Sequence, residues 1–410
     1  MYTQVRLYLV LLLSVAWLWV GCGTPTDTNN NNSNTNANSN GNGNENNNST
    51  SNNNENTNTA PTLPTDLKEG WSMFDGGEGT VCSRGDKFSF FVRKGKVNKV
   101  IIDFIGGGAC WDARSCSIAD AIFSDSVEPL RKAFLAGGGY KKGIYDWERA
   151  DNPFKDWYHI TIPYCTGDIH WGNNVVTYTP DKGEPFKINH KGAVNARYVL
   201  DWVYKRFSKP EKILVTGCSA GAYGSILWSA HVAKQYPDSK VYQMGDCGAG
   251  IITDTFLKDS FPSWKAEEAM PTWIPTFDPS KVKITDHDLS YLYINIAGHY
   301  KNHLFSQYNT AFDENQTFYF KAMGGQGNEE WGAKMRDMMD KIHKDTPNFR
   351  TYIASGKKHC ILVENRFYEV KVKGVKFMDW LYKLAEGEAV ENITCEGDAC
   401  KEPTVPSTKP

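Results

Sequence analysis

Short apolar runs recur along the chain, and each of them ends in a cluster of glycine or polar residues. Four runs are rich in β-branched and aromatic residues and have the length of buried strands: residues 99–105, 157–163, 212–217 and 348–354. Residues 192–207 place apolar side chains at helical spacing, which predicts a helix packed on a sheet. Strands separated by helices predict an α/β fold with a mostly parallel central sheet flanked by helices.

The run at residues 212–217 stops at a Gly-x-Ser-x-Gly sequence centred on Ser219, and a second predicted helix, residues 222–235, follows. This is the context of a nucleophile elbow, in which a sharp strand-to-helix turn strains the serine backbone and lifts its hydroxyl above the sheet. Glycines on both sides keep side chains out of the close contact between helix and strand. Ser219 is therefore the candidate nucleophile, whereas Cys218 precedes the position that an elbow presents.

Three glycines, Gly106, Gly107 and Gly108, follow the predicted strand at residues 99–105 directly. Without side chains, their backbone N–H groups can point into a cleft, as an oxyanion hole built from a strand-end loop requires. We therefore expect this loop to lie beside the serine.

A polar and aromatic loop, residues 164–173, follows the predicted strand at residues 157–163. Ligands of open α/β sheets bind at the carboxyl ends of the strands, so this loop should lie at the same edge as the glycines. His170 and Trp171 are candidate substrate contacts, with a structural role equally open, and Trp111 beside the glycine loop is a third candidate. Residues 256–288 are irregular and rich in proline, tryptophan and charge, which favours a cap over the site.

A serine nucleophile needs a base, and the base needs an orienting acid. Chains with an elbow place these groups in the order Ser, Asp, His. His359 lies in the loop after the predicted strand at residues 348–354 and is the best-placed base. Asp313 lies between the two in sequence and is the acid we favour. The spacing alone leaves other acids open: Asp246, Asp286, Asp288 and Glu314.

The first residues have the pattern of an export signal, with Arg6 before an apolar stretch at residues 7–20. Gly21-Cys22 resembles the processing site of bacterial lipoproteins, in which the cysteine is acylated, and an ordinary secretory signal is the alternative. The sequence thus predicts a lipoprotein-type signal peptide at 1–21, a disordered Asn-rich linker at 22–62, a catalytic domain at 63–390 and a C-terminal tail at 391–410. We expect an exported protein at a bacterial cell surface or outer membrane, tethered through Cys22, or else a secreted one.

Composition excludes one class of partner and constrains the cysteines. The net charge of −2 and the scattered lysines and arginines give no basic stripe, so nucleic acid is not an expected partner. Ten cysteines in an exported chain predict disulfides, and setting Cys22 aside leaves nine, of which one should stay free. Cys395 and Cys400 are close enough to close a small loop. With no C-x-x-C pair and dispersed histidines, we expect no zinc site, and the chemistry requires no metal or cofactor.

Several blocks, in this order, resemble the pectin acetylesterase and Notum family of serine carboxylester hydrolases. The resemblance runs from Cys82 to about Trp380. It is carried by residues 106–111, 163–168, 217–221, 312–316 and 359–360. The family resemblance implies an α/β-hydrolase-like fold, Ser219 as nucleophile, Asp313 as acid and His359 as base.

The resemblance also implies an oxyanion hole formed by the Gly106, Gly107 and Gly108 loop with the amide of Ala220. Two departures bear on which acyl group is accepted: Ala109 precedes the cysteine of the glycine motif while Trp111 follows it, and Gly221 is followed by alanine where many relatives have a second glycine.

The leading prediction is a serine esterase that removes acetyl groups from a pectin-like or other polysaccharide. One alternative keeps the machinery and changes the substrate: a Notum-like deacylase that removes a longer acyl chain. The other is a surface lipoprotein that binds glycans without hydrolysing them.

Overall fold

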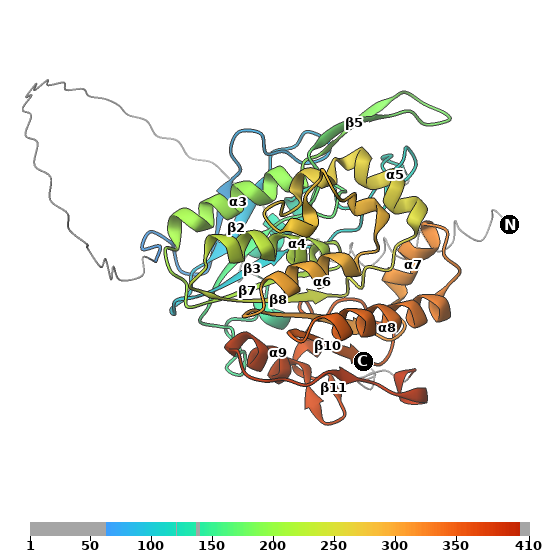
Figure 1. The fold of residues 1–410 in the computed structure, drawn as a ribbon. Coiled ribbons are helices and arrows are strands. Elements are labelled where there is room, and N and C mark those ends of the chain that lie inside the picture. The colour runs from blue at the N-terminus through green and yellow to red at the C-terminus, as the bar shows by residue number, and fades with distance from the viewer. Residues whose placement is uncertain (1–62, 120, 137–139, 402–410) are drawn as a thin grey trace, which may run out of the picture. The chain divides into compact units, whose positions relative to one another are not determined.

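The computed structural model describes residues 63–401, apart from residue 120 and residues 137–139 (Figure 1). The predicted signal peptide, the lipid attachment at Cys22 and the Asn-rich linker fall on residues 1–62 and lie outside the described residues. No helix among the described residues is both long enough and apolar enough to cross a bilayer.

A nine-stranded sheet forms the centre of the described fold, in the order β1-β2-β4-β3-β7-β8-β9-β10-β13. Every neighbouring pair from β4 to β13 is parallel, and β1 and β2 add an antiparallel edge. This confirms the expected mostly parallel sheet. The strands are β1 (Trp71–Asp75), β2 (Ser89–Arg93), β3 (Lys99–Phe104), β4 (Tyr158–Ile162), β7 (Lys212–Cys218), β8 (Lys240–Asp246), β9 (Leu304–Thr310), β10 (Phe349–Ala354) and β13 (Ile393–Thr394).

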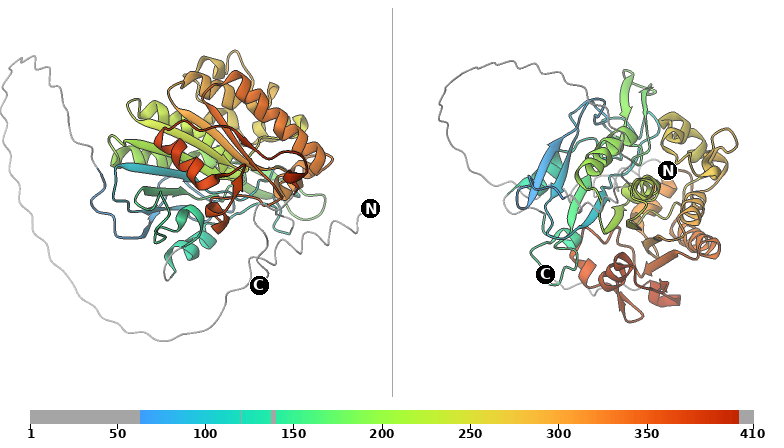
Figure 2. Two further views of the ribbon diagram at one scale, coloured as in Figure 1. Left: turned by 90° about the horizontal axis from the view of Figure 1, so that it is seen from below. Right: turned by 60° about the vertical axis from the view of Figure 1, so that its left-hand side comes forward.

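Helices cover both faces of this sheet (Figures 1 and 2). Four lie on one face: α3 (Gly192–Arg206), α4 (Ala220–Gln235), α6 (Ser290–His299) and α8 (Asn328–Asp345). The other face carries α2 (Glu128–Leu135) and α9 (Phe377–Glu386). In α9 the buried residues Phe377, Trp380, Leu381 and Leu384 recur at i, i+3, i+4 and i+7. This spacing gives the helix one apolar face, by which it packs on the sheet.

Two small hairpins stand apart from the main sheet. The first joins β5 (Asn174–Tyr178) to β6 (Phe186–His190) and projects from the body of the fold in Figure 1. The second joins β11 (Lys371–Val372) to β12 (Val375–Lys376).

Two expectations about the organisation need correction. The segment expected to be irregular, residues 256–288, includes most of helix α5 (Asp254–Trp264), whose pattern is masked by Pro262 inside the helix. The side-chain oxygen of Thr253 caps this helix by accepting from the amide of Phe256. Part of the expected C-terminal tail belongs to the folded domain, because β13 pairs with β10 and extends the parallel sheet.

The carboxyl ends of the parallel strands bring the predicted site residues to one edge of the sheet. The glycine loop follows β3, Ser219 follows β7, Asp313 follows β9 and precedes α7 (Glu314–Ala322), and His359 follows β10. This edge is where parallel α/β sheets bind ligands.

Candidate active site

Ser219 occupies a strained turn between β7 and α4. Its backbone has φ 56° and ψ −121°, in a region that L-residues rarely adopt, and its N–H donates to the carbonyl of Asp246 at 2.8 Å. A side chain at Gly221 would overlap the carbonyl oxygen of Phe104 on the neighbouring strand β3. The glycines of the motif are therefore required by close packing, as the elbow predicts.

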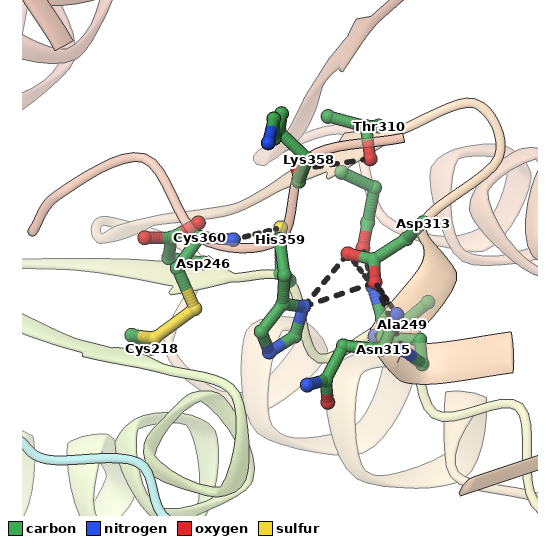
Figure 3. Close-up of polar contacts among 12 residues, drawn as sticks. Cys218, Asp246, Ala249, Thr310, Asp313, Asn315, Lys358, His359 and Cys360 are labelled. Atoms are coloured by element: carbon green, nitrogen blue, oxygen red, sulfur yellow. Dashed lines mark hydrogen bonds and ion pairs between the residues drawn. A yellow bond between two sulfur atoms is a disulfide. The ribbon is translucent and has the colours of Figure 1, made fainter. Parts of the chain in front are cut away.

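His359 is held by a buried carboxylate. Its Nδ1 donates to Asp313, 2.8 Å from Oδ2 and 3.0 Å from Oδ1 (Figure 3). Asp313 is fully buried and caps the first turn of α7, where Oδ1 accepts from the amides of Asn315 at 3.0 Å and Gln316 at 2.8 Å. The side-chain amide of Gln316 also donates to Oδ2 at 3.1 Å.

These contacts decide the charge of Asp313. Burial by itself would raise the pKa of this carboxyl, but the facing His359 and the hydrogen bonds from His359 and Gln316 outweigh burial and hold the pKa below its ordinary value. An ionised Asp313 accepts from Nδ1–H and so leaves Nε2 as the nitrogen that can take a proton.

The structure brings Ser219 and His359 to the same space without joining them. Both residues line one groove, yet no hydrogen bond between them is formed in the described structure. His359 Nε2 is buried and has no hydrogen-bond partner among the described residues. Such contacts are often long without substrate and tighten when it binds.

The glycine loop and the start of α4 offer backbone donors next to the serine. Gly106, Gly107 and Gly108 line the same groove as Ser219, and Ala220 is the first residue of α4. Within the described residues none of these four amides donates to another protein group. A side chain at Gly106 would overlap the Cys218 carbonyl, so only glycine fits here. These donors are available to a developing oxyanion.

Asp246, one of the alternative acids, has a different position. It ends β8, is fully buried, and accepts from the amides of Ile361 (2.8 Å) and Leu362 (2.9 Å) in the loop after His359. Burial raises its pKa to about 6. It therefore holds the His359 loop rather than the imidazole ring.

The remaining alternative acids have other partners. Asp288 pairs with Lys341 at 2.7 Å, and Glu314 pairs with Lys357 at 3.1 Å. Asp286 lies in a short 3-10 turn, Ile284–Asp286, and forms no hydrogen bond or ion pair with His359 among the described residues. Among the described residues, the only carboxylate bonded to the His359 ring is that of Asp313.

Four disulfides confirm the expectation from the cysteine count: Cys82–Cys165, Cys110–Cys116, Cys218–Cys360 and Cys395–Cys400. Cys247 is the one free thiol among the nine, all of which are described. The small loop closed by Cys395 and Cys400 is as predicted. Sequence reasoning left the other pairings open.

The Cys218–Cys360 disulfide joins the residue before Ser219 to the residue after His359 (Figure 3). The guanidinium of Arg366 donates to the carbonyls of residues 358, 359 and 360. The histidine loop is thus held by a covalent bond, by Asp246 and by Arg366. No local signal in the sequence indicates the disulfide or the bonds to Asp246, because these partners are 142 and 115 residues apart along the chain.

Two of the three predicted substrate contacts have structural roles. His170 and Trp171 are both buried and line neither of the spaces beside the serine. His170 Nε2 donates to the carbonyl of Ile105 at 2.8 Å, and burial lowers its pKa to about 4. Trp171 Nε1 donates to the carbonyl of Tyr223 at 3.0 Å. They brace the end of β3 and helix α4. Trp111, in contrast, lines a pocket beside Ser219.

Two spaces meet at Ser219. The first, which we call the apolar pocket, has a volume of about 60 Å³. Its walls include Trp111, Ala220, Ile251, Phe256, Tyr319 and Met323. The second, the groove, has a volume of about 350 Å³. Its walls include Asp103, the glycine loop, Tyr145, His359 and Val363. His359 lines only the groove, and Ala220 lines only the apolar pocket.

Three groups of side chains bring possible metal ligands together in the described residues. Two of them use disulfide-bonded cysteines: Cys110, Cys116 and His190, and Cys218, His359 and Cys360. Disulfide sulfurs do not offer the thiolates that bind metals. The third combines Cys247 with the bonded pair of Asp313 and His359, and burial raises the pKa of that thiol well above its ordinary range. The donor sets therefore fit a metal poorly.

Comparison with known proteins adds three findings. A family model described as Pectinacetylesterase matches residues 72–274. Pectin acetylesterase 7 of Arabidopsis thaliana is 32% identical over 155 residues, 37% of this chain and 37% of the plant protein. Pectin acetylesterase 11 of the same plant is 29% identical over 177 residues, 42% of this chain and 43% of its own. The chain thus matches less than half the length of these curated relatives.

Among solved structures, the Wnt deacylase Notum from Drosophila superposes with a TM-score of 0.56 at 17% identity. The match covers 79% of this chain and 96% of the Notum chain. At this identity the likeness shows a shared fold.

Proposed function

The chain belongs to the pectin acetylesterase and Notum family, and we propose that it is a serine esterase that releases a short acyl group, most simply acetate, from a large alcohol such as a polysaccharide. Ser219 is the proposed nucleophile, His359 the base and Asp313 the acid that orients it. The proposal needs no metal or cofactor.

In this mechanism His359 Nε2 takes the proton of the Ser219 hydroxyl as its oxygen attacks the ester carbonyl carbon. The carbonyl electrons move to oxygen, and the amides of the glycine loop and Ala220 stabilise that charge, each such donor being worth about 10²–10³ in kcat. His359 then gives the proton to the departing alcohol oxygen. Water, deprotonated by His359, attacks the acyl-enzyme and releases the carboxylic acid and free Ser219.

The arrangement of the two spaces carries the proposal. His359 must protonate the departing alcohol, so the alcohol occupies the space that His359 lines, which is the groove of about 350 Å³. The acyl group then occupies the other side of the carbonyl, the apolar pocket of about 60 Å³. A volume of about 60 Å³ gives the apolar pocket room for about four to six groups the size of a water molecule. This is enough for an acetyl group and too little for a long acyl chain.

A second candidate, removal of a longer acyl chain, is favoured by one observation. The apolar pocket is lined by large flexible or aromatic side chains, including Met323 and Phe256, and the fold is that of a Wnt deacylase. Side chains of this kind can repack around a longer chain.

The test is hydrolysis of p-nitrophenyl esters from acetyl to palmitoyl by the wild type and by Ser219→Ala. We expect acetyl turnover, a loss in kcat of about 10⁵–10⁶ in the variant, and a fall in kcat/KM by about tenfold or more from acetyl to octanoyl. Equal activity in Ser219→Ala would contradict the mechanism. A preference for palmitoyl would replace the first candidate by the second.

We further propose that the enzyme is exported. The four disulfides support this, because such bonds persist in oxidising compartments. Tethering to a bacterial membrane through a lipid on Cys22 stays a prediction from the sequence. Metabolic labelling with a radioactive fatty acid, compared between wild type and Cys22→Ala, tests it.

A further inference from the structure

The wall of the groove carries a buried carboxylate that the proposed chemistry does not use. Asp103 lies on β3, three residues before Gly106, and its side chain is buried on the sheet face that carries α2 and α9. Asp103 and Tyr145 line the groove together with Ser219 and His359. The alcohol part of a bound ester would therefore extend from Ser219 toward the carboxylate of Asp103.

The hydrogen bonds of Asp103 leave one of its oxygens to a ligand. The Tyr145 hydroxyl and His159 Nε2, the latter at 3.0 Å, both donate to Oδ2. The rings of Tyr145 and His159 stack with their centroids 4.8 Å apart, so each ring holds the other in position to donate to Asp103. Among the described residues no donor bonds to Oδ1, which keeps its full capacity to accept hydrogen bonds.

The described walls of the groove offer an anionic ligand no permanently charged cation. No lysine or arginine is among the described residues that line it. Arg366, beside the histidine loop, directs its guanidinium to three backbone carbonyls. A uronate ring in the groove would bring a second carboxylate toward Asp103, whereas a neutral sugar would offer hydroxyl donors to Oδ1.

We propose that Asp103 determines specificity at the groove and selects O-acetylated neutral sugars over acetylated uronates. The proposal rests on the proposed esterase function and on the placement of the alcohol in the groove. The proposal predicts a substrate other than the pectin named for the plant relatives, since pectin is a polyuronate. Its physical basis is one carboxylate with a free acceptor oxygen, and no lysine or arginine among the described residues that line the groove.

The test compares acetate release from acetylated xylan and from acetylated polygalacturonate at equal ester concentration, with p-nitrophenyl acetate as a third substrate. In the wild type we expect kcat/KM for xylan to exceed that for polygalacturonate by about tenfold or more, as like charges in an interface oppose binding. In Asp103→Asn the ratio should fall to about threefold or less. Turnover of p-nitrophenyl acetate by the variant is used only to show that it is folded and active.

Asp238→Asn is the matched control, because Asp238 is exposed just before β8, at the opposite end of the sheet, and should keep the wild-type ratio. A wild-type ratio near one or in favour of polygalacturonate would overturn the proposal, whether or not the variant folds. An unchanged ratio in an active Asp103→Asn enzyme would overturn it as well. Absence of p-nitrophenyl acetate turnover in the wild type would instead contradict the proposed function itself.

Discussion

Two buried carboxylates flank the His359 loop, and their pKa values shift in opposite directions. Asp313 faces the imidazole, caps α7 and has a pKa below its ordinary value. Asp246 bonds the loop through backbone amides, and burial raises its pKa to about 6. Both are completely buried, so burial does not separate them. The difference is that the imidazole of His359 bonds directly to Asp313, whereas Asp246 bonds only to backbone amides. The bonded partner, more than the depth of burial, therefore sets the role of each acid.

The substitution Asp313→Asn is the most severe test of this comparison. The amide keeps the shape but cannot hold the Nδ1–H tautomer or stabilise an imidazolium, so kcat for p-nitrophenyl acetate should fall by about 10³–10⁴. KM should change little, because Asp313 does not line the groove or the apolar pocket. A loss in kcat of less than tenfold would show that another acid orients His359.

Removal of the Cys218–Cys360 disulfide tests how well Asp246 and Arg366 hold the His359 loop without the covalent bond. The double change to serine opens a link between residues 142 apart and should lower the free energy of unfolding by about 2–4 kcal/mol. The Cys395–Cys400 double change is the control, since it spans only 5 residues and should cost less. Urea denaturation measures both. If kcat survives loss of the disulfide, the bonds to Asp246 and Arg366 together suffice to hold His359.

Asp246→Asn should have the smallest effect on kcat, about tenfold, because one amide of the loop then faces an NH₂ group. Its distinctive effect is on the pH dependence of stability. The pKa is about 6 in the folded chain and about 3.9 unfolded, so the native state binds more protons between these values. The wild type should therefore lose stability as pH rises from 4 to 6, by up to about 3 kcal/mol, relative to the variant.

Asp313 should have the opposite effect on how stability changes with pH. Its folded pKa lies below the unfolded value, so its contribution is present above about pH 4 and is lost as pH falls through the folded pKa. Urea denaturation of each variant and the wild type from pH 3 to 7 checks the pair. Parallel pH profiles for Asp246→Asn and the wild type would contradict the raised pKa.

Local sequence patterns predicted much of the fold. The strands at β3, β4, β7 and β10 and the helix α3 were expected within a residue or two, since apolar periodicity and turn residues act over short distances. The elbow was predictable for the same reason: its glycines and serine are contiguous. The same patterns failed at α5, where Pro262 hides the helix, and at β13, whose two residues are too short to show a strand period.

The active site, like the fold, was predicted only in part. Sequence order and resemblance proposed Ser219, Asp313 and His359, but they left Asp246 as an open alternative and the disulfide pairing undetermined. They also could not tell that His170 and Trp171 face inward while Asp103 faces the groove. The sequence by itself determined which residues end each strand at the active edge, because that is local backbone chemistry. Only the tertiary structure decided which side chains meet there, because contacts between segments from 46 to 142 residues apart depend on how the sheet and its helices pack.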